Sequence, residues 1–258
     1  METQRAITWS YGGGTQSIAI AVLVAQGRLP KPECVVIADT GREATETWDY
    51  LAAHVRPLLR SVGINVSIAG HDYATVDLYS HKGELLIPAY TQNGKLDTFC
   101  SSEWKAAVIQ RFLRAQGYGP KHPVRTWMGI STDEKKRAKP QGLKWQQLHW
   151  PLLFDVPMTR AECRQLVLDF GLPEPPKSSC WMCPHRRDGQ WKRLKDYYPD
   201  DFEQACRLDE EARAADQQGG VWLHESRTPL REVDFKIVIP IHPLFDRATG
   251  CDGGNCWV

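Results

Sequence analysis

Short apolar runs alternate with longer amphipathic segments over the first 130 residues of the chain. The apolar runs have the length and composition of buried strands, and the amphipathic segments repeat apolar residues at the helical period. The pattern predicts strands over residues 6–9, 33–38, 65–69 and 124–130, and helices over residues 17–26, 43–62 and 101–117. Strands that alternate with helices form a parallel sheet whose ligand site lies at the carboxyl ends of the strands. The predicted fold class is therefore α/β, a Rossmann-like parallel sheet sandwiched by helices.

The pattern changes after Trp150, where a smaller region is predicted. Thr159 and Glu162 have the spacing of a capping box, so a helix should begin there and end at Gly171. A segment rich in proline and cysteine follows over residues 173–191, and another helix is predicted over residues 201–216. We therefore expect an α/β domain over residues 1–154 and a Cys-rich helical accessory region over residues 155–258.

The composition is typical of a folded, soluble protein. Hydrophobic residues make up 42% of the chain and charged residues 24%, and the net charge is +1. The chain as a whole therefore has no basic field that would attract nucleic acid. Its first residues lack the pattern of a signal peptide, and no apolar run reaches the roughly 18 residues of a membrane helix. We expect a cytoplasmic protein with no membrane partner.

Eight cysteines call for an explanation, because the cytosol keeps thiols reduced and a disulfide framework is not expected there. Cys34 lies in an apolar run, and Cys163 and Cys206 follow helical patterns, so these three are predicted to pack in the core. The other five lie in polar, turn-rich segments: Cys100, Cys180, Cys183, Cys251 and Cys256. The C-x-x-C spacing of the second and third of these is typical of a metal site.

Three consecutive glycines lie between the first predicted strand and the first predicted helix. Glycine permits close approach of the backbone to a ligand, and a helix N-terminus favours phosphate. The sequence therefore predicts a phosphate-binding loop, in which a side chain at Gly13 would fill the phosphate cradle. The loop lacks the lysine of a Walker motif and matches the dinucleotide fingerprint only in part. The nucleotide-binding residues predicted in this loop and after the second strand are Ser10, Tyr11, Gly12, Gly13, Gly14, Thr15, Gln16, Ser17, Asp39, Thr40 and Gly41.

Four segments resemble, in family order, motifs of the PP-loop ATP pyrophosphatases, in the branch related to phosphoadenosine phosphosulfate (PAPS) reductases. YGGGTQS is similar to the PP-loop S-G-G-x-D-S, and ADTGRE to the segment beside the adenosine. CSSEWK resembles a C-x-x-x-x-K element, and GISTDEKKR a G-x-x-x-D-E-x-x-R element. The four span about residues 6–140. The loop departs from the family pattern at two positions, since Gly12 replaces a serine and Gln16 an aspartate.

The resemblance implies an adenine nucleotide alpha hydrolase-like fold that binds ATP, or an adenylated sulfur compound, together with Mg²⁺. Lys105 and Arg137 are then expected to neutralise phosphate charge, and Asp133 and Glu134 to hold Mg²⁺ or to orient those cations. Asp39 is expected to bond the ribose or the adenine.

The resemblance also implies that Cys100, Cys180 and Cys183 meet beside the loop. Three thiolates could hold a 4Fe-4S cluster with one iron open. The alternatives are a structural zinc site that adds His185, a redox-active C-x-x-C pair, and cysteines that hold no metal. A fourth ligand could come from one of the two terminal cysteines, Cys251 and Cys256.

These expectations favour an enzyme that cleaves ATP to AMP and pyrophosphate and uses the adenylate for sulfur transfer to a nucleic acid. Its partners would be that acceptor or a sulfur-donor protein, and a homodimer stays open. One alternative is a phosphosulfate reductase, which the lack of a second cysteine next to Cys100 disfavours. Another is a non-catalytic nucleotide- or zinc-binding subunit, which Gln16 keeps open. Residues 186–195, basic around Trp191, are predicted to contact a polyanion or to form an ordinary helix face.

Overall fold

The computed structural model describes residues 5–70, 78–83, 85–97, 99–140, 143–215 and 220–235. Its centre is a five-stranded sheet in the order β3-β2-β1-β6-β7, with every neighbouring pair parallel. The strands are β1 (Ala6–Ser10), β2 (Cys34–Ala38), β3 (Val66–Ala69), β6 (Val124–Met128) and β7 (Gln146–His149). The strand order reverses between β1 and β6, the point where such sheets bind ligands. The predicted α/β class is confirmed.

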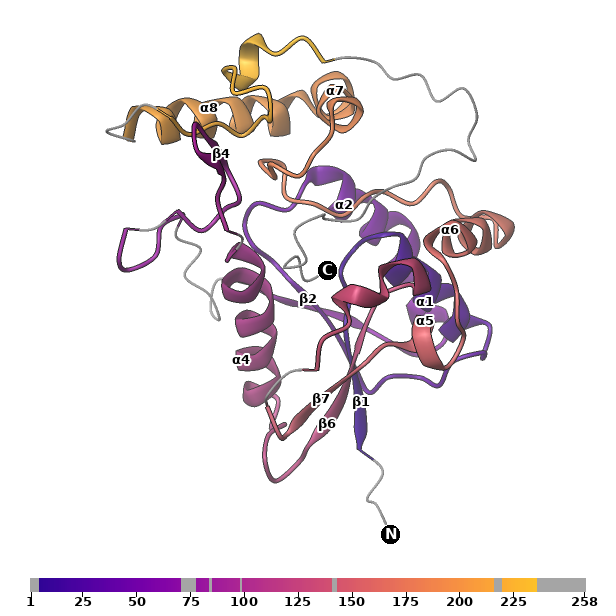
Figure 1. The fold of residues 1–258 in the computed structure, drawn as a ribbon. Coiled ribbons are helices and arrows are strands. Elements are labelled where there is room, and N and C mark those ends of the chain that lie inside the picture. The colour runs from indigo at the N-terminus through magenta and orange to yellow at the C-terminus, as the bar shows by residue number, and fades with distance from the viewer. Residues whose placement is uncertain are drawn as a thin grey trace.

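Helices cover both faces of the sheet (Figure 1). On one face, α1 (Thr15–Ala25) packs against α6 (Arg160–Asp169), α3 (Arg56–Ser61) and α5 (Pro151–Phe154), around a core that contains Trp9 and Trp127. On the other face lies α4 (Ala107–Ala115), which packs on β2 and β3. Because α4 sits over that half of the sheet, the same face of β6 and β7 is open to form a pocket.

Two predicted helices contain a wider turn at one point. Residues 43–62 form α2 (Thr45–Tyr50), the π-helical turn η1 (Leu51–Val55) and then α3. The helix starts after Glu43 because Glu43 makes an antiparallel bridge with Cys180. The predicted helix over residues 101–117 likewise opens with the π-helical turn η3 (Ser102–Ala106) before α4.

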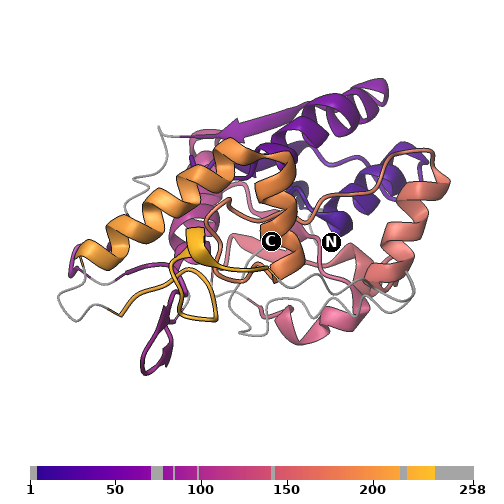
Figure 2. The same cartoon turned by 90° about the horizontal axis from the view of Figure 1, so that it is seen from above.

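A second hydrophobic core is built by helices that lie beyond the carboxyl ends of the strands (Figures 1 and 2). Its helices are α7 (Asp188–Tyr197), α8 (Pro199–Ala215) and the 3-10 turn η5 (Leu230–Glu232). The small hairpin of β4 (Tyr90–Thr91) and β5 (Gly94–Lys95) lies beside them, and residues 86–89 and Trp104 complete the core. Neither core is therefore confined to one side of residue 155, where the sequence predicts a boundary.

Several local predictions are confirmed. Thr159 and Glu162 form the capping box of α6, and α8 covers most of the helix predicted over residues 201–216. Cys163 and Cys206 are buried, one in each core, and Cys34 packs at the edge of the core under α4. Strand β7 is not predicted, because its sequence, QQLH, is largely polar. Among the described residues, no helix combines the length and the apolar character that crossing a membrane requires.

Asp201 joins the second core to the sheet domain, and its removal should destabilise the protein. Its two carboxylate oxygens accept hydrogen bonds from the Thr45 N–H (2.7 Å) and the Thr45 hydroxyl (2.8 Å), at the first turn of α2. Asp201→Ala leaves these donors without a buried acceptor, so the free energy of unfolding should fall by about 1–3 kcal/mol. Chemical denaturation measures this change. Asp200→Ala, an exposed carboxylate in the same turn of α8, should cost much less, and equal losses would contradict the assignment.

Candidate functional site

The glycine loop connects β1 to α1 at the centre of the sheet. Gly14 is the N-cap of α1, and the following residues of the helix are buried. The Gly12 N–H donates to the Ser17 hydroxyl (3.0 Å), and the Ser178 hydroxyl donates to the Gly12 carbonyl. The loop is therefore held from its own helix and from the Cys-rich segment. It presents a helix N-terminus at the sheet edge, which is the geometry that favours an anion.

Gly13 is required for a different reason from the one the sequence suggests. Its φ of +76° lies in the left-handed region, and a Cβ there would lie 2.5 Å from Thr47 Cγ2 and 3.5 Å from Ser178 Cβ. A side chain at Gly13 would thus collide with α2 and the Cys-rich segment, rather than fill a phosphate cradle. The conformation and the close contact both favour glycine.

Gln16 connects the loop to the charged turn η4 (Thr132–Arg137). Its Nε2 donates to Glu134 Oε2 (3.0 Å) and to the Ser131 hydroxyl (3.3 Å). The same Glu134 oxygen accepts from Arg137 Nη1 at 2.9 Å. Glu134 is buried and accepts from two protein donors, so this arrangement favours the orientation of Arg137 over metal binding by Glu134.

The other two predicted polar residues are held by local backbone. The Asp133 carboxylate accepts from the Arg160 N–H (3.0 Å) at the start of α6. Asp39 accepts from the Gly41 N–H (2.8 Å) within its own turn, where Gly41 has a φ of +64°. The Thr40 hydroxyl accepts from the Arg42 N–H at 3.2 Å. Asp39 therefore shapes the turn after β2.

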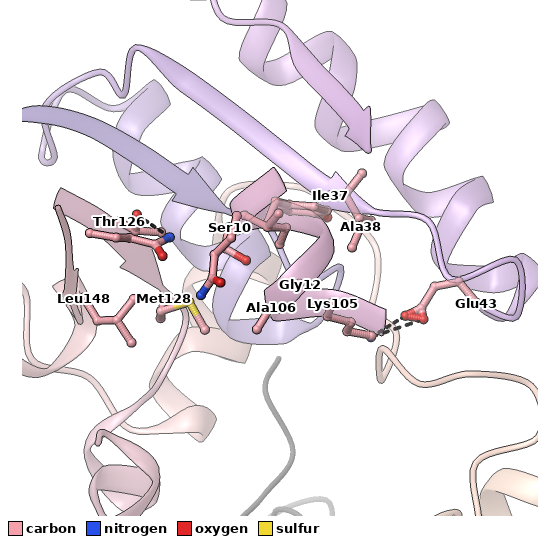
Figure 3. Close-up of a pocket in the computed structure, with 14 residues that line it drawn as sticks. Ser10, Gly12, Ile37, Ala38, Glu43, Lys105, Ala106, Thr126, Met128 and Leu148 are labelled. Carbon is pink, nitrogen blue, oxygen red and sulfur yellow. Dashed lines mark hydrogen bonds and ion pairs between the residues drawn. The ribbon is translucent and has the colours of Figure 1, made fainter. Parts of the chain in front are cut away.

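Lys105 forms a close ion pair with a residue that the sequence does not single out as a site residue. Its Nζ lies 2.7 Å from Glu43 Oε1 and 3.4 Å from Oε2 (Figure 3). The Glu43 side chain is only 2% exposed and that of Lys105 21%. Burial acts to lower the pKa of Lys105, but the charge of Glu43 and its hydrogen bond outweigh burial, and the net pKa is raised. Lys105 therefore stays charged at neutral pH.

A pocket lies between this ion pair and the glycine loop (Figure 3). The space between its lining atoms is about 540 Å³, part of which is open solvent. Its apolar walls come from the ends of β2, β6 and β7 and from α4 and the turn before it. Its polar groups come from the glycine loop, from Glu43 and Lys105, and from Thr126 and Gln146, which form the floor of the pocket. The apolar lining residues are Ile37, Ala38, Ala106, Ile109, Met128 and Leu148.

The three predicted cysteine ligands lie in one neighbourhood beside the ion pair. Cys180 Sγ lies 3.9 Å from Glu43 Oε2 and 3.8 Å from the Thr40 hydroxyl. Burial raises the pKa of Cys180, as do the charge of Glu43 and, less strongly, those of Cys183 and Cys100. The Cys180 thiol is therefore protonated at neutral pH when no metal is bound.

The C-x-x-C turn is formed by its own backbone and by Arg186. The Cys183 N–H donates to the Cys180 carbonyl at 3.1 Å. The Arg186 guanidinium donates to the carbonyls of Cys180 and Ser179, each at 3.2 Å. Burial lowers the pKa of Arg186, against the charges of nearby thiols. A cation fixed beside the turn suits thiolate ligands, because it offsets their charge.

The described residues do not form a preformed tetrahedral zinc site. Ligand atoms on one tetrahedral zinc lie within about 4 Å of one another, given Zn–S bonds of about 2.3 Å. Within the part of the chain that the structure describes, no three His, Cys, Asp or Glu side chains are arranged to hold a metal ion. His185, the fourth ligand of the zinc alternative, has its Nδ1 2.7 Å from Lys95 Nζ. Cys251 and Cys256 lie outside the described residues.

The basic segment over residues 186–195 includes most of α7. Trp191 is fully buried in the second core, so this side chain is not available to contact a polyanion. Trp191 has the spacing of the apolar face of a helix. The charged residues around it make this spacing hard to recognise in the sequence. Arg193 pairs with Glu46, and Lys192 with Asp196. The segment is an amphipathic helix that packs by Trp191 and Leu194.

Comparisons with known proteins give distant similarity only. No family model matches the chain, and no curated protein matches it. Among solved structures, the chain is similar to the U34-tRNA thiolase NcsA from Methanococcus maripaludis, a structure with its 4Fe-4S cluster. The TM-score is 0.44 and the identity 14%, over 83% of this chain and 73% of that chain. A similarity at this level assigns no role to a residue.

Breaking the Lys105–Glu43 pair from one side should destabilise the protein in a pH-dependent way. In Lys105→Met, Glu43 is buried without a cation, which should cost about 3 kcal/mol of unfolding free energy at pH 7, the low end for a buried pair. The loss should shrink as the pH falls from 7 towards 4, because acid protonates the unpaired carboxylate and so removes its buried charge.

The double variant Lys105→Met/Glu43→Gln is the control, because it removes both charges. It should regain most of the lost stability at pH 7 and show no such pH dependence. Denaturation curves at pH 7 and pH 4.5 measure both effects. A double variant as unstable as the single one would show that the loss comes from packing rather than from an unpaired charge.

Proposed function

We propose that the chain binds ATP in this pocket and cleaves it between the α and β phosphates, in the manner of a PP-loop ATP pyrophosphatase. The observation that carries the proposal is the position of the pocket. It lies between a glycine loop at a helix N-terminus and a half-buried lysine that stays charged. An apolar slot with an anion site at one side and a cation at the other fits a base with a phosphate chain.

The residues divide the work by their chemistry. The loop N–H groups would hold the phosphates, and Lys105 would neutralise charge as an acceptor oxygen attacks the α-phosphorus and pyrophosphate leaves with the bonding electron pair. Glu43 fixes Lys105, and Glu134 fixes Arg137, so both cations are oriented before the substrate arrives. Mg²⁺ bound with the nucleotide would add positive charge on the phosphates. Because the Glu134 carboxylate already accepts hydrogen bonds from Gln16 and Arg137, Asp133 is the better candidate for the protein ligand of Mg²⁺.

The adenylate would serve sulfur transfer to a nucleic acid. Cys100, Cys180 and Cys183 lie beside the proposed phosphate site and would hold a 4Fe-4S cluster, with the fourth iron open. When bound, such a cluster supplies an iron position that can carry a sulfur atom. A thiolate set next to an adenylating site places the sulfur source near the activated carbon or phosphate of the acceptor.

Pyrophosphate release from ATP should depend on Arg137. The wild-type protein, incubated with ATP, Mg²⁺ and bulk tRNA, should release pyrophosphate in a coupled assay. Arg137→Met should lower the turnover rate, because the loss of one electrostatic donor removes about 2–4 kcal/mol of transition-state stabilisation. Arg125→Met, at an exposed position of β6, is the matched control and should keep full turnover. Nucleotide binding without pyrophosphate release would favour the non-catalytic alternative, and sulfite release from an adenylated sulfate the reductase.

The metal content should depend on the three cysteines near the pocket. Anaerobically prepared protein should contain iron and absorb in the visible range. Cys100→Ser, Cys180→Ser and Cys183→Ser should each lower the iron content. Cys206→Ser is the control, because that thiol is buried in the second core and its pKa is raised by burial to about 11. Zinc in place of iron, or full iron in the Cys100 variant, would overturn the cluster assignment.

A further inference from the structure

The floor of the pocket carries three polar side chains from adjacent strands. Thr8 lies on β1, Thr126 on β6 and Gln146 on β7, and the last two line the pocket. The Thr8 and Thr126 hydroxyls lie 2.9 Å apart, and Gln146 Nε2 donates to the Thr126 hydroxyl at 3.1 Å. The walls of the pocket next to these side chains are apolar, so they cannot hydrogen-bond to a ligand. The polar side chains of the floor can.

One atom of this network has no partner. The Gln146 residue is only 3% exposed, and its Oε1 is buried without a hydrogen bond among the described residues. A buried acceptor that is left unpaired costs free energy, so such an atom in a binding pocket indicates a donor on the ligand. The Nε2 end of the amide donates to the Thr126 hydroxyl, so Oε1 is the end of the side chain that has no partner. Gln146 therefore presents an acceptor to whatever occupies the pocket.

We propose that Gln146 selects the base of the nucleotide by accepting a hydrogen bond from the exocyclic amino group of adenine. The inference rests on the proposed function and deepens it. The faces of the base would lie against the apolar walls, among them Met128 and Leu148. A base with a carbonyl at that position, such as hypoxanthine, would place its oxygen against Gln146 Oε1 and leave both acceptors unpaired. Discrimination by a buried, oriented acceptor is strong, because the wrong base leaves it unsatisfied.

The test compares nucleotides that differ only at this group. Calorimetry measures the affinity of the full-length protein for ATP, for purine riboside triphosphate, which lacks the amino group, and for inosine triphosphate. The wild type should bind ATP about tenfold or more tightly than either analogue, the scale of one buried acceptor left unpaired. Gln146→Met keeps the side-chain length and removes the acceptor, so it should bind all three with affinities within about threefold.

Gln147→Met is the matched control, because the adjacent glutamine points to the exposed side of β7. It should keep the wild-type preference. A Gln146→Met variant that still prefers ATP, or a wild type that prefers inosine triphosphate, would overturn the role of Gln146. A wild type that binds no nucleotide would overturn the proposed function itself. Circular dichroism shows that each variant is folded, and Gln146→Leu replaces the methionine variant if that one is not.

Discussion

The ion pair between Lys105 and Glu43 is the contact on which the arrangement of the site depends. It joins the turn before α4 to the segment after β2, two parts of the chain that are 62 positions apart. Glu43 in turn bridges to Cys180, and the Ser179 carbonyl accepts from the Ala44 N–H. The carboxylate of Glu43 thus holds Lys105, while the backbone around Glu43 holds the sulfur-bearing turn at the edge of the sheet. A buried charge pair adds little stability compared with an apolar pair, so its value here is to fix positions.

The second core supplies what the sheet alone does not. Parallel strands end in loops, which need support to hold side chains in place at the sheet edge. Here Trp104 enters the second core directly before Lys105, and Met182 enters it within the C-x-x-C turn. Asp201 fastens the same region to α2. The helices α7 and α8 therefore support the Cys-rich segment. They are not an addition to a sheet domain whose site is complete without them.

The sequence predicts the parts of the fold that have a strong local pattern. The apolar runs of β1 and β2, the glycine loop and the capping box of α6 all specify their structure over a few residues. Strand β7 is missed because QQLH carries no apolar alternation, and what makes it a strand is its pairing with β6. Glu43 and Ser178 are missed for a related reason, since their importance comes from partners far along the chain. The role of Trp191 stays open in the sequence because its neighbours are basic, and only the fold shows that its side chain faces the core.

The two departures of the loop from the PP-loop pattern have a common physical explanation. Gln16 stands where the pattern has an aspartate, and its amide donates to the Glu134 carboxylate. An aspartate there would face a second carboxylate, and two such groups in one buried site disfavour each other's charge. Gly12 stands where the pattern has a serine, and the Ser178 hydroxyl reaches its carbonyl from the Cys-rich segment. At both positions the missing group has a counterpart of the same chemical type on another segment. The loop therefore keeps a carboxylate and a hydroxyl beside it, and it depends on η4 and on the Cys-rich turn to supply them.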